Sequence, residues 1–375
     1  MAQLPESFFR RATRDLVPYE PGKPVEEVQR ELGLERVVKL ASNEGPLGPF
    51  PAAVEAMDRV TRELNRYPDG GAWALRNALA ELHDVSFDEI AIGAGADGVI
   101  DALTQAVLDE GDEIVTGWPS FPSYVIDAIK AGAVPVTVPL REHRFDLDAL
   151  LDAVTPKTKI VYVCHPNNPT GTSNTRAELE SYFGQVPDHV LTVIDQAYYE
   201  YATADPDYVD AVAEHFKQGR RVLVLRTFSK IYGLAGLRVG YGVGPAEVVR
   251  ELAKVRRAFD VAATAQAGAL ASLRDEAELE RRRRENAAGR EQLEAIVRAH
   301  GLEPAGPALG NFLYVETGVP GREVFEQLLR QGVIVRPLDG FGATDAIRVS
   351  VGTPEENELF GAALGHVRLG VFKTG

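Results

Sequence analysis

The sequence is poor in the features that mark secreted and membrane proteins. Its 375 residues contain one cysteine, Cys164, so an intrachain disulfide is impossible and a reducing compartment is expected. It has no apolar run of 18 residues, and its first residues, MAQLPESFFRRATRDLVPY, lack the apolar centre of a signal peptide. These absences predict a cytoplasmic protein without a membrane span.

Positive charge is also scarce relative to negative charge. The formal net charge of −15 argues against general nucleic-acid binding. Hydrophobic residues make up 45% of the chain and charged residues 25%, as in ordinary globular enzymes. The length is sufficient for two domains whose cores need no disulfide or metal, and no metal site is predicted.

Short apolar runs separated by helical patterns dominate the first two thirds of the chain. The runs that predict strands are 89–92, 113–117, 134–138, 159–164, 190–195, 221–226 and 237–243. Strands that alternate with helices predict an α/β fold with a mainly parallel seven-stranded sheet between helices. Ligands of such sheets bind at the carboxyl ends of the strands.

The pattern changes after about residue 265. A long charged helix is predicted over Glu278–His300 and ends before Gly301, and shorter strands and helices follow. We predict an N-terminal arm (1–35) that packs with the small domain or a partner subunit, a large cofactor-binding domain (36–265) and a small α+β domain (266–375). The run Arg281–Arg284 is interpreted as a solvated helix face.

The segment GAGADG, Gly93–Gly98, follows a predicted strand and opens a predicted helix. Its G-x-G-x-x-G spacing matches a dinucleotide fingerprint, which keeps an NAD-dependent enzyme as an alternative. The physics is more general, because glycines let backbone N–H groups and a helix N-terminus face any phosphate. Gly95, Ala96 and Asp97 are therefore candidate phosphate-binding residues.

Four further motifs follow predicted strands: HPNNPTG, IDQAYYEY, TFSK and GLAGLRVGY. They carry an amide (Asn168), a carboxylate (Asp195), a phenol (Tyr198), an amine (Lys230) and a guanidinium (Arg238). Because the carboxyl ends of parallel strands meet at one edge of a sheet, these groups are expected to share one pocket.

This set of groups matches the chemical needs of pyridoxal 5′-phosphate. Its aldehyde needs an amine, which Lys230 supplies, and its ring nitrogen needs a buried carboxylate, Asp195. Its ring oxygen needs neutral donors, which Asn168 and Tyr198 provide. Its phosphate needs a helix N-terminus, hydroxyls and an arginine. The residues assigned to the phosphate are Gly95, Ala96, Asp97, Thr227, Ser229 and Arg238.

With these motifs, the sequence resembles the fold-type I, class I/II aminotransferases, and in particular their histidinol-phosphate aminotransferase branch. The resemblance covers nearly the whole chain and includes PYEPGKP, LASNEGPLGP, NRYPDG, HPNNPTG, RTFSKIYGLAGLRVGY and IRVSVG. It implies an aspartate-aminotransferase-like fold, with Lys230, Asp195 and Tyr198 as catalytic residues. It also implies that Phe121 stacks on the cofactor ring.

The resemblance implies a homodimer with shared active sites and a set of substrate-binding residues. Tyr67 is similar to a tyrosine that reaches the cofactor phosphate of the neighbouring subunit. Arg348 matches an arginine that grips a substrate carboxylate. Tyr19, Asn43 and Arg336 match positions that contact the substrate or line the entrance to the site.

The chain departs from the family pattern at Gly45, Gly98, Phe121 and Gln196, where the family often has Asn, Glu, Tyr and Glu. None of these departures removes a required group, since Phe121 keeps an aromatic face. The loss of a hydroxyl at position 121 nevertheless bears on the choice of substrate.

The predicted reaction is transamination of histidinol phosphate with 2-oxoglutarate, giving imidazole acetol phosphate and glutamate in histidine biosynthesis. Three alternatives stay open beside the NAD-dependent enzyme. They are an aromatic amino-acid aminotransferase for phenylalanine or tyrosine, a pyridoxal-phosphate-dependent decarboxylase of a phosphorylated amino acid, and a non-catalytic regulator on the same fold. The intact catalytic groups argue against the regulator.

Overall fold

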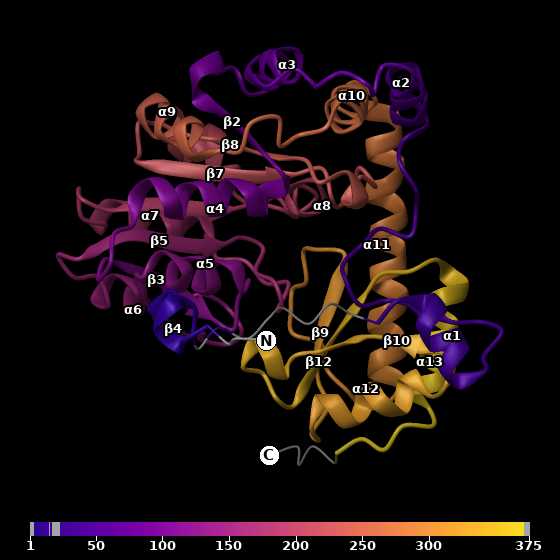
Figure 1. Cartoon of the computed structure of the whole chain (residues 1–375). Coiled ribbons are helices and arrows are strands. Elements are labelled where there is room, and N and C mark those ends of the chain that lie inside the picture. The colour runs from indigo at the N-terminus through magenta and orange to yellow at the C-terminus, as the bar shows by residue number, and fades with distance from the viewer. Residues whose placement is uncertain (1–3, 15, 17–22, 371–375) are drawn as a thin grey trace.

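The computed structural model describes residues 4–14, 16 and 23–370, and two sheets organise it (Figure 1). The larger sheet has seven strands in the order β2-β8-β7-β6-β5-β3-β4. Their bounds are β2 Ile90–Gly93, β3 Glu113–Trp118, β4 Val134–Pro139, β5 Thr158–Cys164, β6 Leu191–Asp195, β7 Val222–Thr227 and β8 Gly240–Val243. Only β8 pairs antiparallel with its neighbours, so the predicted mainly parallel seven-stranded sheet is confirmed.

The strands of this sheet read as apolar runs because helices cover them. The helices that accompany the sheet are α2 Pro51–Thr61, α3 Trp73–His83, α4 Gly95–Val107, α5 Ser123–Ala131, α6 Leu147–Asp152, α7 Arg176–Gln185, α8 Tyr199–Ala202, α9 Ala246–Val255 and α10 Ala263–Ser272. One continuous hydrophobic cluster joins the buried strands to these helices.

Strand register decides which strand ends become neighbours. Cys164 is paired with Asp195, and Asp195 with Leu225, across three adjacent parallel strands. Gly240 lies between Thr227 and Gly93. The loops that follow β2, β5, β6 and β7 therefore leave the sheet at one rim, as the sequence predicts.

The smaller part of the fold contains a three-stranded antiparallel sheet with the order β11-β12-β9. Its strands are β11 Arg336–Pro337, β12 Ala346–Ser350 and β9 Phe312–Glu316, and it is accompanied by α12 Gly321–Leu329 and α13 Pro354–Leu364. A two-stranded parallel ladder joins β1 Val38–Lys39 to β10 Val333–Ile334. A second hydrophobic cluster fills this part.

Two further helices complete the fold. The N-terminal α1 Val25–Leu32 buries Val28 against Ile334, next to the β1–β10 ladder. The long α11 Glu276–Ala299 runs from beside α10 to α13 (Figure 1), and Gly301 follows it with φ +74°. Single turns of 3₁₀ helix lie at Glu6–Phe8, Arg11–Thr13, Phe87–Glu89, Ala235–Leu237 and Asp339–Phe341, and a π turn at Val212–Phe216. No helix in the described ranges combines the length and apolarity needed to cross a membrane.

Phe360→Ala tests the second cluster, because Phe360 is fully buried there. Loss of the ring should lower the free energy of unfolding by about 3–5 kcal/mol. The change is measured from urea unfolding curves. Glu358→Ala, on the exposed side of the same helix, should change it by less than about 0.5 kcal/mol. Equal effects of the two substitutions would contradict the packing described.

Candidate active site

A cavity of about 220 Å³ lies at the rim where the strand ends meet. Its lining residues are Gly95, Ala96, Asp97, Phe121, Cys164, Asn168, Asp195, Ala197, Tyr198, Thr227, Ser229, Lys230 and Arg238. All the residues predicted to bind a cofactor are in this set except Tyr67. The convergence follows from the strand register, whereas the role of each residue stays a prediction.

Asp195 is the buried carboxylate of the cavity. Its Oδ2 accepts a hydrogen bond of 2.7 Å from the Tyr124 hydroxyl, and its Oδ1 accepts one of 3.0 Å from the Ala197 N–H. Burial raises the pKa of Asp195, while the two hydrogen bonds oppose that rise. Sequence reasoning missed Tyr124, although it lies only three residues after Phe121, in the first turn of α5.

Hydrogen bonds hold Tyr198 and Asn168, the two neutral donors predicted for the site. The Tyr198 hydroxyl accepts from Asn43 Nδ2 at 2.9 Å, and the Asn43 N–H donates to Ser350 Oγ at 2.9 Å. Asn168 Oδ1 accepts from Arg348 Nη1, and Arg348 Nη2 donates to the Ala41 carbonyl at 2.7 Å. Burial raises the pKa of Tyr198 above its usual range, so its hydroxyl keeps its proton.

A helix N-terminus and a guanidinium lie together at one end of the cavity. Helix α4 begins at Gly95 without a side-chain cap, so the N–H groups of its first turn have no partner from a capping residue. A Cβ at Gly95 would lie 2.9 Å from Arg238 Nη2, and a Cβ at Gly240 would lie 2.3 Å from the Ala96 nitrogen. These two glycines thus let Arg238 and β8 approach the helix start.

Two hydroxyls complete this end of the cavity. Thr227 Oγ1 donates to Ser229 Oγ at 3.1 Å and accepts from the Ser229 N–H at 3.2 Å. Hydroxyls, a guanidinium and a helix N-terminus together are donors that suit a phosphate.

Lys230 brings the only amine of the cavity lining. Its Nζ lies 5.4 Å from the centre of the Tyr198 ring. Desolvation is the main cause that lowers the pKa of Lys230 to about 8, and the nearby charges of Arg348 and Arg238 lower it further. A substantial fraction of the amine is therefore neutral near physiological pH, as a nucleophile requires.

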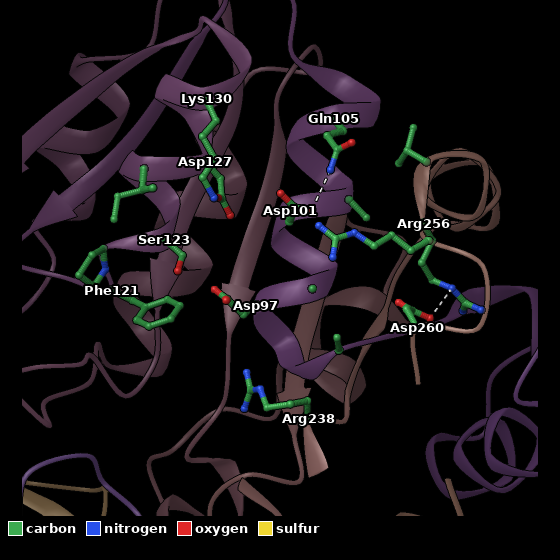
Figure 2. Close-up of a pocket in the computed structure, with 17 residues that line it drawn as sticks. Asp97, Asp101, Gln105, Phe121, Ser123, Asp127, Lys130, Arg238, Arg256 and Asp260 are labelled. Carbon is green, nitrogen blue, oxygen red and sulfur yellow. Dashed lines mark hydrogen bonds and ion pairs between the residues drawn. The ribbon is translucent and has the colours of Figure 1, made fainter. Parts of the chain in front are cut away.

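A larger groove of about 820 Å³ opens beside the cavity and shares Asp97, Phe121 and Arg238 with it. Figure 2 shows its side chains. Its labelled residues are Asp97, Asp101 and Gln105 along α4, Phe121, Ser123, Asp127 and Lys130 at α5, Arg256 and Asp260 after α9, and Arg238. The amine of Lys230 and the carboxylate of Asp195 line the smaller cavity and not the groove, so the smaller cavity is the candidate active site.

Two of the predicted substrate residues, Arg336 and Arg348, lie on the smaller sheet. Arg336 and Arg348 are paired across β11 and β12, and both guanidinium groups lie within 6 Å of the Phe341 ring centre, at 5.7 and 5.8 Å. Asn43 contacts Tyr198, as described above. Tyr19 lies outside the described residues.

Gln196 departs from the family pattern, but both polar atoms of its side chain form hydrogen bonds. Its Nε2 donates to the Tyr208 hydroxyl at 2.9 Å and to the Val209 carbonyl at 2.7 Å, and its Oε1 accepts from Arg226 Nη2 at 2.9 Å. An ionised glutamate could not donate to the Val209 carbonyl. The amide therefore fits this environment and anchors the residue next to Asp195.

The family of the chain follows from comparison with known proteins. The family described as aminotransferase class I and II matches residues 35–364. The chain belongs to this family and is an aminotransferase.

Two relatives with similar sequences identify the branch of the family to which the chain belongs. A histidinol-phosphate aminotransferase of Moorella thermoacetica is 46% identical over 95% of this chain and 92% of its own length. One from Akkermansia muciniphila is 45% identical over 94% of this chain and 96% of its own length. The predicted branch is thereby confirmed.

Solved structures share the fold. The crystal structure of histidinol-phosphate aminotransferase from Sinorhizobium meliloti in complex with pyridoxal-5′-phosphate has a TM-score of 0.86 at 29% identity and covers 96% of both chains. An aspartate aminotransferase mutant of Thermus thermophilus has a TM-score of 0.82 at 25% identity, covering 95% of this chain and 98% of its own. The predicted aspartate-aminotransferase-like fold is confirmed.

The lowered pKa of Lys230 predicts a pH-dependent stability of the cofactor-free protein. Between about pH 8 and the unfolded value of 10.5, the unfolded chain binds more protons than the folded one, so stability should rise with pH. In Lys230→Met this contribution disappears. The difference in urea midpoint between variant and wild type should therefore favour the variant at about pH 7 and shrink above about pH 8.

Lys157→Met serves as the control, since Lys157 is an exposed lysine outside the cavity. Its difference from the wild type measures the effect of removing one lysine charge from the surface. A Lys230→Met difference that stays constant with pH would contradict a lowered pKa of Lys230.

Proposed function

We propose that this aminotransferase uses pyridoxal 5′-phosphate to transfer the amino group of histidinol phosphate to 2-oxoglutarate. The observation that carries the proposal is one cavity that contains an amine with a lowered pKa, a buried carboxylate and an anion-binding helix start. The substrate assignment is supported by relatives of 40–46% identity that are named histidinol-phosphate aminotransferases.

The residues of the cavity fit this cofactor. The uncapped first turn of α4, the Thr227 and Ser229 hydroxyls and Arg238 would hold its phosphate. Asp195 would pair with its ring nitrogen, with Tyr124 and the Ala197 N–H orienting the carboxylate. Asn168 and Tyr198 would donate to its ring oxygen, and Phe121 would stack on its ring.

When bound, the cofactor would supply an aldehyde that joins to amines and a ring that withdraws electrons from the adjacent carbon. Lys230 would bind it covalently in the resting enzyme and, once replaced by the substrate amine, would remove the proton from the substrate carbon that carries nitrogen. Asp195 would keep a proton on the ring nitrogen. The same residues would act in reverse order on 2-oxoglutarate.

The arginine pair supports two different substrates in one site. Histidinol phosphate has no carboxylate next to its amine, whereas glutamate has two carboxylates. Arg348, fixed by Asn168 and Ala41, and its neighbour Arg336 would bind the glutamate carboxylates in one half-reaction. In the other they would assist with the phosphate-bearing substrate, together with Tyr19.

A homodimer is the second part of the proposal. Tyr67 is 82% exposed and stacks on Phe259 at 4.6 Å between ring centres, and Leu64 and Trp73 are exposed nearby in sequence. Phe259 belongs to the segment that also contributes Arg256 and Asp260 to the groove. An exposed apolar group of this kind suits a second copy of the chain, whose Tyr67 would approach the cofactor phosphate.

The predicted domain division and location belong to the same proposal. The predicted division is a large domain over 36–265 and a small domain over 266–375. Two separate hydrophobic clusters support the presence of two domains, but Val38 and Leu40 lie in the cluster of the small domain, so the clusters do not follow the boundary at residue 36. The contact of α1 with Ile334 supports an arm over 1–35. A biosynthetic enzyme with one buried, unpaired cysteine suits the cytoplasm.

A panel of amino donors tests the substrate. With bound cofactor, histidinol phosphate should react with a kcat/KM about 100-fold above that of phenylalanine or tyrosine, because only it presents both an amine and a phosphate. The measurement is the loss of absorbance of the lysine–cofactor chromophore and the appearance of oxo product. Lys230→Ala should lose both half-reactions by about 100-fold or more.

Other results of the panel would favour the alternatives. Faster reaction with phenylalanine or tyrosine would favour an aromatic amino-acid aminotransferase. Release of carbon dioxide from a phosphorylated amino acid would favour a decarboxylase. Unchanged turnover in Lys230→Ala would refute the catalytic assignment itself.

Mixing two inactive variants tests the shared site. Lys230→Ala and Tyr67→Ala each damage both sites of their own dimers. A mixed dimer would contain one site with both residues intact, so an equal mixture should recover about a quarter of wild-type activity. The measurement is turnover before and after co-refolding, and recovery that fails although mixed dimers form would contradict a site completed by Tyr67 of the partner subunit.

A further inference from the structure

Helix α11 connects the two hydrophobic clusters. Leu279, in its first turn, packs against the cluster around the large sheet. Leu293 and Val297, nearer its end, belong to the cluster of the smaller sheet. A side chain on the first half of α11 can therefore link the active-site rim to the part that carries the proposed substrate arginines.

The four consecutive arginines on this helix have different surroundings. Their side chains are 44%, 6%, 28% and 68% exposed in the order Arg281, Arg282, Arg283 and Arg284. Successive residues on a helix are about 100° apart, so the run cannot occupy one face. The predicted solvated face is wrong for Arg282, which points inward.

Three contacts hold the Arg282 guanidinium. Its Nε donates to Glu278 Oε1 at 2.8 Å, and its Nη1 donates to the Ile231 carbonyl at 3.0 Å. The guanidinium carbon lies 4.3 Å from the centre of the Phe50 ring. A buried charge is costly unless it is paired, so these contacts fix its position closely.

The carbonyl that Arg282 binds belongs to the turn that carries Lys230. The Gly233 N–H donates to the Lys230 carbonyl at 3.0 Å, and the Leu234 N–H donates to the Phe228 carbonyl at 3.2 Å. Gly233 has φ +68°, and a Cβ there would lie 2.4 Å from the Gly48 carbonyl oxygen and 3.0 Å from Arg282 Nη1. The turn is therefore enclosed between the 45–48 loop and the Arg282 side chain.

We infer that Arg282 is a positioning residue for Lys230: it anchors the turn from Lys230 to Gly233 to helix α11 through the Ile231 carbonyl. The inference rests on the proposed role of Lys230. An amine that carries a proton between fixed atoms must be held to within a fraction of an ångström, and its own side chain has four rotatable carbon–carbon bonds. Fixing the backbone at its base removes one source of that freedom.

The neighbouring arginine supplies a matched control. Arg281 makes its ion pairs with Glu278 and Glu285 on the surface of the same helix, at the start of the same run. Arg281→Met and Arg282→Met remove the same charge from adjacent positions of one helix. Arg282→Lys keeps a donor near the Ile231 carbonyl but cannot reproduce the planar fork that also binds Glu278.

Steady-state kinetics with histidinol phosphate and 2-oxoglutarate form the first arm of the test. Arg282→Met should lower kcat by about 10-fold or more and leave both KM values within about threefold, because the misplaced amine acts after substrate binding. Arg282→Lys should give an intermediate kcat. Arg281→Met should stay within about twofold of wild type in both parameters.

Hydrogen exchange of the cofactor-free proteins forms the second arm and needs neither substrate nor turnover. The amides of Gly233 and Leu234 should exchange about 10-fold or more faster in Arg282→Met, while the core strands β5 and β6 keep wild-type protection. Should Arg282→Met fail to fold, Arg282→Lys and Glu278→Gln carry both arms, with smaller changes of the same sign.

Three results would overturn the inference: a kcat of folded Arg282→Met equal to wild type, an equal loss in Arg281→Met, or faster exchange spread evenly over the chain. The last would show that Arg282 stabilises the fold as a whole. If the wild type does not turn over histidinol phosphate, the proposed function fails. The hydrogen-exchange experiment alone then decides whether Arg282 holds the turn from Lys230 to Gly233.

Discussion

The parallel pairing of β5, β6 and β7 is the constraint on which the site depends. Hydrogen-bonded register sets the spacing of neighbouring strands at about 4.8 Å, so the loops after Cys164, Asp195 and Thr227 start side by side. The reactive side chains then need only short loops to meet. Antiparallel β8 adds a glycine, Gly240, where a Cβ would lie 2.3 Å from the Ala96 nitrogen at the start of α4.

The pKa shifts in the site follow from the burial of its side chains in one cavity. Withdrawal of Lys230 from water lowers the pKa of its amine, and burial raises the pKa of Asp195. In the absence of a ligand, each group is thus pushed toward its neutral form. A cationic ring nitrogen beside Asp195 would lower the pKa of this carboxyl again, so cofactor binding and ionisation of Asp195 would be coupled. The same burial keeps the thiol of Cys164 protonated, with a pKa raised to about 12, which argues against a nucleophilic role for it.

The sequence predicts the large sheet well because its strands are continuous apolar runs between turn residues. All seven predicted strands exist, and no end is shifted by more than three residues; the last strand begins three residues later than predicted, after the 3₁₀ turn at Ala235–Leu237. The strand-end motifs place Asn168, Asp195 and Lys230 together for the same reason. Local patterns carry this information, since each motif directly follows its own strand.

The remaining parts of the site depend on contacts that no local pattern contains. Arg348 reaches Asn168 across 180 residues, and Asn43 reaches Tyr198 across 155. Tyr124 becomes a partner of Asp195 only because α5 packs on β3 and β4, which lets the Tyr124 ring stack on Tyr162 of β5 and its hydroxyl reach β6. These pairs could not be read from one sequence, because polar side chains in loops have many possible partners.

The arginine run shows where charge patterning misleads. Four adjacent arginines among glutamates are usually solvated, and three of these four follow that rule at least in part. Helical geometry nevertheless turns one position of any four-residue run toward the core, and the cost of burying a guanidinium there must be offset by specific partners. Glu278 lies one turn before Arg282 on the same helix and is always within reach, whereas the Ile231 carbonyl is available only when the lysine turn has its present shape. Folding of the Lys230–Gly233 turn and burial of Arg282 therefore stabilise each other. The four arginines look equivalent in the sequence, but Arg282 cannot be exchanged for one of its neighbours.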